Sequence, residues 1–408
     1  MKEEMTNGNQ SRAMSKPIKL LVIPSWYPPD GGYFFKEHSE ALARMGCKVN
    51  ILVNRVMGIR KIGRVGKEDW HRFNIYKENE LIVIRSIYWK IPGNENLNIG
   101  LWVRSTVRLF RRYIRNFGLP DFILAHSAMW AGLAAAKIWK GYNVPYVITE
   151  HRSFFVWENE AARKMVKSSY IPHLQEAYSL CQNLIIVSYS MKSGLLELFP
   201  ELVNKMKVIP NMVNGNYFHF PEKPRENDPF VFLSAGRLAA VKGLDIIISA
   251  FGELIKKTDR KVFLRIAGRG ELREQLEKQV QKSGLSESVT FLGRVSRDKI
   301  VQEMQEANCF ILASSYEAFG VVLIEAMSTG LPVIATRSGG PEKILDETCG
   351  YMIEPGNIEE LTGAMSKMIS EYDRFNQQSI RERTLRFYGS QIIAEKYLQV
   401  FEGILEKG

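Results

Sequence analysis

Short, continuously apolar segments alternate with longer amphipathic segments along the first half of the chain. The apolar segments predict buried strands over residues 18–24, 48–53, 81–86, 121–125, 144–149 and 183–187. Between the first two, residues 34–45 have helical spacing, and Gly46 is placed to end that helix. Strands that alternate with helices are typical of parallel βαβ units.

The alternation restarts in the second half, after a proline-containing segment at 221–229 that we expect to be a hinge. Strands are predicted over residues 230–235, 261–267, 289–292, 309–313 and 332–335, and helices over 244–257 and 271–283. The two halves, 17–215 and 216–387, therefore each predict a doubly wound, Rossmann-like parallel sheet. Ligands of such sheets lie beyond the carboxyl ends of the strands, so two facing sheets place the ligand in a deep cleft between them.

Composition excludes several classes of protein. The 408 residues are 45% hydrophobic and 24% charged, close to the globular average, which excludes a wholly disordered chain. No apolar run approaches the roughly 18 residues of a membrane span. The polar residues 1–16 lack the apolar core of a signal peptide and predict a disordered tail. The four cysteines form no CxxC pair, so neither a zinc site nor a disulfide framework is indicated, and a cytoplasmic enzyme is expected.

The formal net charge of +11 is unevenly distributed. Residues 1–215 carry 30 Lys and Arg against 17 Asp and Glu, whereas residues 216–408 carry 25 against 27. The first domain is therefore expected to meet something anionic. Nucleic acid, anionic lipid and a phosphorylated acceptor all qualify.

One segment concentrates this charge. Helical spacing over residues 101–117 places five arginines on one face, namely Arg104, Arg108, Arg111, Arg112 and Arg115. An amphipathic helix with such a face is suited to an anionic membrane surface. The same pattern also fits an ordinary surface helix that packs its apolar side on the domain, or a nucleic-acid contact.

Basic residues follow the first predicted strand of the second domain. Gly236 lets the backbone turn closely there, and Arg237 and Lys242 can both point into the mouth of the cleft. Arginine holds phosphate oxygens with a fork of donors, and lysine acts as a point charge. Such pairs are also common on ordinary surfaces, so this motif is weak on its own.

A second candidate lies in the segment 314–327, where a loop carries Glu317 and a helix begins near Gly320. A helix N-terminus presents free N–H groups and a partial positive charge, which attract phosphate. Glu317 precedes this terminus and Glu325 lies about two turns inside the helix, so one carboxylate can meet a sugar and the other a ribose hydroxyl. The alternative is an acidic loop residue beside an ordinary helical glutamate.

Further strand-end loops contain glycine, at 268–270, 291–295 and 338–342, but the full GxGxxG dinucleotide fingerprint is absent. The motif series reads AGR…KG at 235–243, AGRG at 267–270, FLGRV at 291–295, EAFGVVLIEAM at 317–327 and GLPVIAT…GGPE at 330–342. In this order it resembles the retaining glycosyltransferases of family four, which have the GT-B fold. The segment 24–49 resembles that family's opening glycine loop, helix and second strand. The similarity extends over residues 18–405 and is strongest in 230–356.

The resemblance implies a donor site in the second domain, 216–387. Arg237 and Lys242 match the pair that holds the donor diphosphate. Glu317 matches the residue near the hydroxyls of the transferred sugar, and Glu325 the residue that bonds the ribose. The other implied donor-binding positions are Gly236, Arg269 and Val295 in the strand-end loops, the last two framing the nucleobase, and the backbone N–H groups of Phe319, Gly320, Val321 and Val322.

In the first domain, 17–215, the resemblance implies an acceptor side. His151 matches the family's catalytic-region histidine, expected to touch the 6-hydroxyl of the sugar, and His126 matches a histidine deep in the cleft. Gly31 and Gly32 match the loop that approaches the donor phosphate and the acceptor. A helix at 388–406 is expected to cross back to this domain. The implied catalytic residues are Glu317, His151, Arg237 and Lys242.

The implied reaction transfers a sugar from a nucleotide diphosphate sugar to an acceptor hydroxyl, with retention at the anomeric carbon. The chain contains no DxD triplet, so no carboxylate pair is evident to hold a metal on the phosphates, and no cofactor is expected. The acceptor is expected to be a saccharide or a lipid-linked compound. We expect a role in cell-envelope polysaccharide or glycolipid assembly, with peripheral binding at the inner face of the plasma membrane and no nucleic-acid partner.

Three rival functions stay open at this point. The first is a nucleotide-sugar epimerase or hydrolase of the same fold. The spacing of Glu317 and Glu325 (E-x7-E) and the crossing helix favour a transferase over this alternative. The second is a non-enzymatic basic protein that binds membrane or nucleic acid, against which the set Arg237, Lys242, Glu317 and Glu325 argues. The third is a nicotinamide-dependent oxidoreductase, which lacks its glycine fingerprint here.

Overall fold

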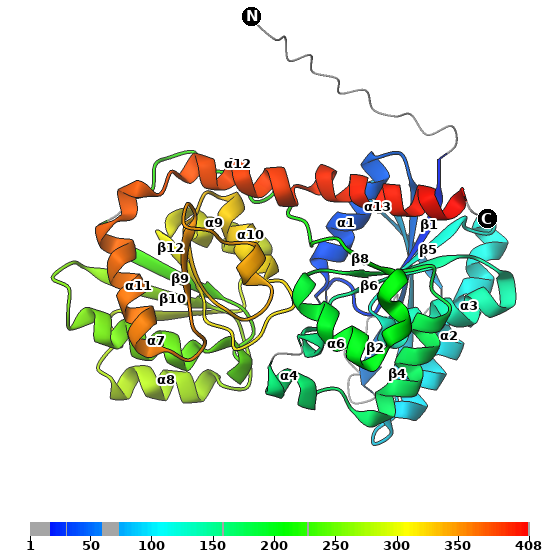
Figure 1. Cartoon of the computed structure of the whole chain (residues 1–408), viewed down its shortest axis with the longest axis horizontal. Helices are drawn as coiled ribbons and strands as arrows, with labels where there is room; N and C mark the ends of the chain where they lie inside the picture. Colours follow the sequence, from blue (N-terminus) through cyan, green and yellow to red (C-terminus); the bar gives the residue numbers. More distant parts are fainter. Residues whose placement is uncertain (1–16, 30, 59–72, 157–158, 227, 407–408) are drawn as a thin grey trace, which may run out of the picture.

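The protein consists of two α/β lobes, joined along one side by two long helices (Figure 1). The computed structural model describes residues 17–29, 31–58, 73–156, 159–226 and 228–406. The predicted disordered tail, 1–16, lies outside the described residues. Two lobes with their own sheets confirm the predicted fold class.

The first lobe is built on a sheet with the order β3-β4-β2-β1-β5-β6-β7-β8. Its strands are β1 (Lys19–Pro24), β2 (Lys48–Gly58), β3 (Asn74–Glu78), β4 (Leu81–Lys90), β5 (Phe122–His126), β6 (Tyr146–Glu150), β7 (Asn183–Ile186) and β8 (Met206–Val208). The strands predicted in this half are confirmed, but β3 corrects the expectation of a purely parallel sheet because it pairs antiparallel with β4. An edge strand that alternates half-buried and exposed residues has no apolar run to reveal it.

Helices cover both faces of this sheet. They are α1 (Tyr33–Arg44), α2 (Glu95–Phe117), α3 (Leu133–Tyr142), α4 (Glu160–Lys164), α5 (Ile171–Ser179) and α6 (Lys192–Leu198). Alternate residues of β1 point to opposite faces, so Leu21 joins the core under α2 and α3 and Leu20 joins the core under α1. Helix α2 contains the predicted arginine segment, and all five of its arginines are exposed.

The second lobe has the strand order β11-β10-β9-β12-β13-β14, with neighbours parallel. Its strands are β9 (Phe230–Ala235), β10 (Val262–Ala267), β11 (Val289–Gly293), β12 (Cys309–Leu312), β13 (Val333–Thr336) and β14 (Gly350–Ile353). Its helices are α7 (Leu244–Ile255), α8 (Arg273–Lys282), α9 (Arg297–Glu306), α10 (Val321–Ser328) and α11 (Ile358–Ser370). The order reverses between β9 and β12, and ligands of open α/β sheets bind at such a switch point.

The last two helices return the chain to the first lobe. Helix α12 (Gln377–Tyr388) lies on the second lobe and α13 (Ser390–Leu405) runs back across the first (Figure 1). The buried side chains of Ile393, Tyr397 and Phe401 belong to the core of the first lobe. The Tyr397 hydroxyl also forms a 3.1 Å hydrogen bond with Thr149 Oγ1 at the end of β6. The C-terminal helix therefore supports the strand that leads to His151.

Candidate active site

The loops after β9 and β12 meet at the switch point of the second lobe. Gly243 has φ +59, and a Cβ atom there would lie 2.2 Å from the carbonyl oxygen of Ala313. Glycine therefore lets the loop that follows β9 close against the end of β12. This close approach brings Lys242 to the predicted site carboxylate.

Lys242 and Glu317 form an ion pair in this loop cluster. Ser314 Oγ donates a 2.9 Å hydrogen bond to the same carboxylate oxygen, Oε1 of Glu317. The Lys242 side chain is 24% exposed and that of Glu317 is 14% exposed, so the pair is only partly accessible to solvent. The structure therefore joins the predicted diphosphate cation to the predicted sugar carboxylate.

The N-terminus of α10 lies directly beyond this pair. Its N-cap, Gly320, has φ +97, and no side chain caps the helix. The first N–H groups of a helix have no partner within the helix, so the backbone from Phe319 to Val322 presents donors here. The preceding loop is fixed on its other side, because Gly340 N–H donates to the Glu317 carbonyl at 3.0 Å and a Cβ at 340 would lie 2.3 Å from Phe319 Cα.

Arg237, another predicted donor residue, is not part of the Lys242–Glu317 pair. The Arg237 side chain is 72% exposed and forms an ion pair with Glu271 at 3.2 Å, so the structure does not bring it to Glu317. The Arg269 side chain is exposed and Val295 is half-buried, both in strand-end loops as predicted. Gly236 packs closely against Gly268. A side chain at position 268 would not fit, because its Cβ would lie 1.8 Å from the Gly236 carbonyl oxygen.

Glu325 lies on α10 and contacts Arg297, at 3.7 Å, instead of Lys242. Burial raises the pKa of the Glu325 carboxyl to about 8, against the opposing effect of Arg297. The E-x7-E spacing therefore puts the two carboxylates in different surroundings, one beside a lysine and one beside an arginine.

In the first lobe, two of the predicted residues meet at the carboxyl ends of β5 and β6. His126 Nδ1 and His151 Nε2 lie 3.1 Å apart. Phe35 of α1 stacks on His126 with ring centroids 4.2 Å apart. Burial lowers the pKa of His151 to about 3 and holds the pKa of His126 well below its ordinary value. Both rings are therefore neutral at neutral pH, able to donate or accept a hydrogen bond without carrying charge.

Two residues of this cluster were missed from the sequence. The buried Glu150 carboxylate accepts the N–H groups of Ala128 and His151, at 3.0 and 2.9 Å, and the Tyr178 hydroxyl at 3.1 Å, so it orients the segment after β6. His38 of α1 packs on Tyr397 with ring centroids 4.1 Å apart. Glu150 could have been found from the sequence, because it is a carboxylate at the end of an apolar strand. His38 could not, because nothing in its helical spacing distinguishes it from other residues of α1.

The glycine loop of the first lobe reaches the second lobe. Gly31 and Gly32 have φ +111 and +75, and a Cβ at 32 would lie 2.8 Å from the Trp26 carbonyl oxygen. Arg294 Nη2, in the second lobe, donates to the Pro29 carbonyl of the first lobe at 3.4 Å. The predicted acceptor loop therefore lies against the predicted nucleobase loop.

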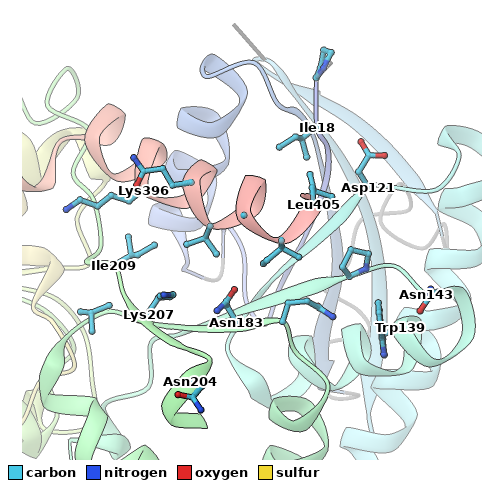
Figure 2. Close-up of a pocket in the computed structure, with 18 residues that line it drawn as sticks. Ile18, Asp121, Trp139, Asn143, Asn183, Asn204, Lys207, Ile209, Lys396 and Leu405 are labelled. Atoms are coloured by element: carbon cyan, nitrogen blue, oxygen red, sulfur yellow. The ribbon is translucent and has the colours of Figure 1, made fainter. Parts of the chain in front are cut away.

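A large cavity lies elsewhere, at the opposite end of the first sheet (Figure 2). It has a volume of about 1230 Å³ and lies under α13, beside residues such as Ile18, Asn183 and Lys396. Ile18 precedes β1 and Asn183 begins β7, so this cavity faces the amino ends of the strands. It is lined by none of the predicted site residues.

The described residues contain neither a metal-binding cluster nor a membrane-spanning helix. Within 17–29, 31–58, 73–156, 159–226 and 228–406, no group of three or more His, Cys, Asp or Glu side chains is arranged to hold a metal ion. None of the helices in those ranges combines the length and apolar character that crossing a bilayer requires.

Comparison with known proteins decides the family. The model of glycosyl transferases group 1 matches residues 217–384, and that of glycosyltransferase family 4 matches residues 32–216. The chain is a family 4 type glycosyltransferase. A probable sucrose-phosphate synthase of Thermosipho melanesiensis is 26% identical over 92% of each chain. The protein is therefore an enzyme of the transferase class, as its motif series predicted.

Solved structures agree with the fold of this glycosyltransferase. Sucrose-phosphate synthase of Thermosynechococcus elongatus matches 96% of this chain and 100% of its own, with a TM-score of 0.77 and 19% identity. HepE of Anabaena, in complex with UDP and glucose, matches 94% of this chain and 100% of its own, with a TM-score of 0.72 and 18% identity. These similarities confirm the GT-B architecture.

The buried imidazoles predict that the glycosyltransferase loses stability in acid. His38 and His151 each have a pKa of about 3 in the folded state against 6.5 when unperturbed, both because of burial. Below 6.5 the unfolded chain therefore binds protons that the folded chain does not, and stability falls as the pH drops toward 3. Thermal melting between about pH 7.5 and 5 measures this loss. A His38→Phe variant keeps a ring on Tyr397 and should show a shallower decline; an equally steep decline would contradict the assignment to His38.

Proposed function

We propose that this glycosyltransferase moves a sugar from a nucleotide diphosphate sugar to an acceptor hydroxyl, with retention and without a metal ion. One observation carries the proposal: Lys242 and Glu317 are paired at the uncapped N-terminus of α10, at the switch point of the second sheet. The cation and the free backbone N–H donors of this site suit a diphosphate. The carboxylate suits a sugar hydroxyl. The neighbour solved with UDP and glucose supports a donor of this class.

The charges of the site suit the bond that breaks. Cleavage of the sugar–phosphate bond leaves negative charge on the departing diphosphate, and preorganised donors aimed at developing charge are often the largest catalytic contribution. Lys242 exchanges Glu317 for a phosphate oxygen, which frees the carboxylate to accept a sugar hydroxyl. We expect the neutral His151 to bond the 6-hydroxyl without adding charge near the oxocarbenium-like sugar. In a front-face reaction the acceptor proton passes to the leaving phosphate, so no separate base is required.

A donor screen tests this function. Thermal shifts are measured with uridine- and guanosine-linked sugars, since a ligand of the native state raises the apparent stability. Product from the stabilising donor is then analysed for its anomeric configuration. We expect the new glycosidic linkage to have the same anomeric configuration, axial or equatorial, as the sugar in the donor. Inversion would refute the retaining mechanism, and release of free sugar or its epimer with every acceptor mixture would favour the rival hydrolase or epimerase.

Metal dependence is tested with the same assay. We expect EDTA to leave the rate unchanged, because Lys242 and the α10 terminus take the place of a divalent cation on the diphosphate. A loss of activity that Mg²⁺ or Mn²⁺ restores would contradict this assignment of Lys242.

The acceptor is proposed to be a saccharide or a lipid-linked compound met at an anionic membrane surface, in envelope polysaccharide or glycolipid assembly. Among the described residues, Arg104, Arg108 and Arg115 of α2 take part in no ion pair. Leu97 and Leu119, at the two ends of that helix, are 46% and 49% exposed. Unpaired cations flanked by exposed apolar side chains are suited to an interface of anionic headgroups and acyl chains.

Liposome flotation tests the membrane proposal. We expect binding to vesicles that contain phosphatidylglycerol and little binding to phosphatidylcholine alone. The double variant Arg104→Glu/Arg108→Glu should lower the bound fraction several-fold, since each basic residue contributes about 1 kcal/mol at such a surface. Lys278→Glu/Lys282→Glu, on the exposed side of α8 in the other lobe, is the matched control. Equal flotation of both double variants would contradict the role of α2.

A further inference from the structure

The guanidinium of Arg297 joins the two lobes beside the predicted ribose carboxylate. Arg297 is the first residue of α9, in the second lobe, and its Nη2 lies 2.8 Å from Glu37 Oε1 on α1 of the first lobe. The same nitrogen lies 3.7 Å from Glu325 Oε1 on α10. We call this set the Glu37–Arg297–Glu325 bridge.

The surroundings of this bridge make its charges interdependent. The Arg297 side chain is 19% exposed and that of Glu37 is 8% exposed. The rings of Tyr33 and Tyr217 lie 5.2 and 4.7 Å from the guanidinium carbon, so aromatic groups from both lobes enclose the cation. In such a poorly hydrated place, removing one member of an ion pair leaves a costly unpaired charge. Burial raises the pKa values of Glu37 and Glu325, and Arg297 opposes both shifts.

Helix α1 connects the bridge to the acceptor side of the cleft. Its N-cap is Gly32 of the acceptor loop, and its Phe35 stacks on His126. Glu37 lies on the same helix, two positions after Phe35. A group that fixes Glu37 therefore also fixes the surface on which the histidine pair rests.

We propose that Arg297 is a positioning residue that couples recognition of the donor ribose by Glu325 to the placement of α1 against the second lobe. This inference rests on the proposed function, because it requires a nucleotide donor at Glu325. Arg297 favours the ionised form of the Glu325 carboxyl group and orients that group for the ribose hydroxyls, and at the same time it holds α1 through Glu37. Donor binding at Glu325 and the position of α1 on the acceptor side then depend on the same residue, Arg297.

The experiment compares Arg297→Met, Arg297→Lys and Glu37→Gln, with Lys299→Met as the control. Lys299 lies on the same helix but pairs with Glu303, away from the bridge. Dissociation constants are measured by titration calorimetry for UDP and GDP, and for the 2′-deoxy form of whichever binds wild type more tightly. Donor KM and kcat are measured with the donor found in the screen.

We expect wild type to prefer the ribonucleotide to its 2′-deoxy form by about 10-fold or more, as for a lost hydrogen bond to a charged group. Arg297→Met should abolish most of this preference and raise donor KM, and Arg297→Lys should restore part of both. Glu37→Gln should keep the preference but lower kcat, because Glu325 retains its cation while α1 loses its anchor. Lys299→Met should match wild type.

Two results would overturn the inference while leaving the function intact. One is an unchanged ribose preference in Arg297→Met, and the other is a wild-type kcat in Glu37→Gln. A wild type that binds neither nucleotide and transfers no sugar would instead overturn the proposed function, and the inference with it.

Discussion

Replacing Lys242 with alanine is expected to lower kcat at least about 100-fold, the typical loss when one preorganised group that stabilises transition-state charge is removed. The lysine is half-buried and hydrogen-bonded to the site carboxylate, so its position is fixed before any donor arrives. Steady-state rates with saturating donor and acceptor measure the effect. Glu317→Ala is expected to cause a loss of similar size, because it removes both the proposed sugar contact and the partner that orients Lys242.

A control separates lost chemistry from lost structure. Lys256 forms an exposed pair with Glu253 at the end of α7 in the same lobe, and Lys256→Ala should leave the rate unchanged. Melting temperatures of the Lys242→Ala and Lys256→Ala variants show whether the lobe is intact. A folded Lys242→Ala enzyme with a near-normal kcat would remove this residue from the reaction.

Gly268→Ala is expected to abolish donor binding. A Cβ at 268 would lie 1.8 Å from the Gly236 carbonyl oxygen, and the residue has φ +144, which L side chains rarely adopt. The loops after β9 and β10 must separate to admit a methyl group, and these loops are predicted to frame the nucleotide. We expect nucleotide affinity to fall more than about 100-fold, in line with the sensitivity of binding and catalysis to displacements of 1 Å.

Gly284→Ala is the matched control for this prediction. Gly284 also has a positive φ, +69, but a Cβ there would meet nothing within 4 Å. The control should lose only about 1 kcal/mol of stability, the cost of the left-handed backbone, and keep its nucleotide affinity. Wild-type affinity in Gly268→Ala would show that the two loops do not have to be close to bind the donor.

The predictability of the fold followed from burial. Strands such as β1, β5 and β9 are buried on both faces, so their sequences are continuous apolar runs that are visible without any structure. Strands β3, β8 and β14 escaped prediction because they are short and partly exposed, which leaves no such run. The return of the C-terminal helix to the first lobe rested on resemblance, because an amphipathic pattern does not say which lobe it covers.

The site was predictable to a different degree at each residue. The glycines and charged residues chosen from the sequence do follow strands, and the carboxyl ends of parallel strands lie along one edge of the sheet. The partners of those residues were not visible. Arg237 pairs with Glu271 and Glu325 with Arg297, and neither pairing follows from spacing along the chain.

The sequence by itself determined the two-sheet architecture, the family, and the strand ends at which we propose that the chemistry lies, because local periodicity and short motifs encode these features. Only the tertiary structure decided that Lys242 meets Glu317, that His126 meets His151, and that Arg297 joins the two lobes. These contacts join residues that are distant along the chain. Burial also shifts the pKa values of some of the groups involved, such as His151. Both properties exist only once the lobes have folded and met.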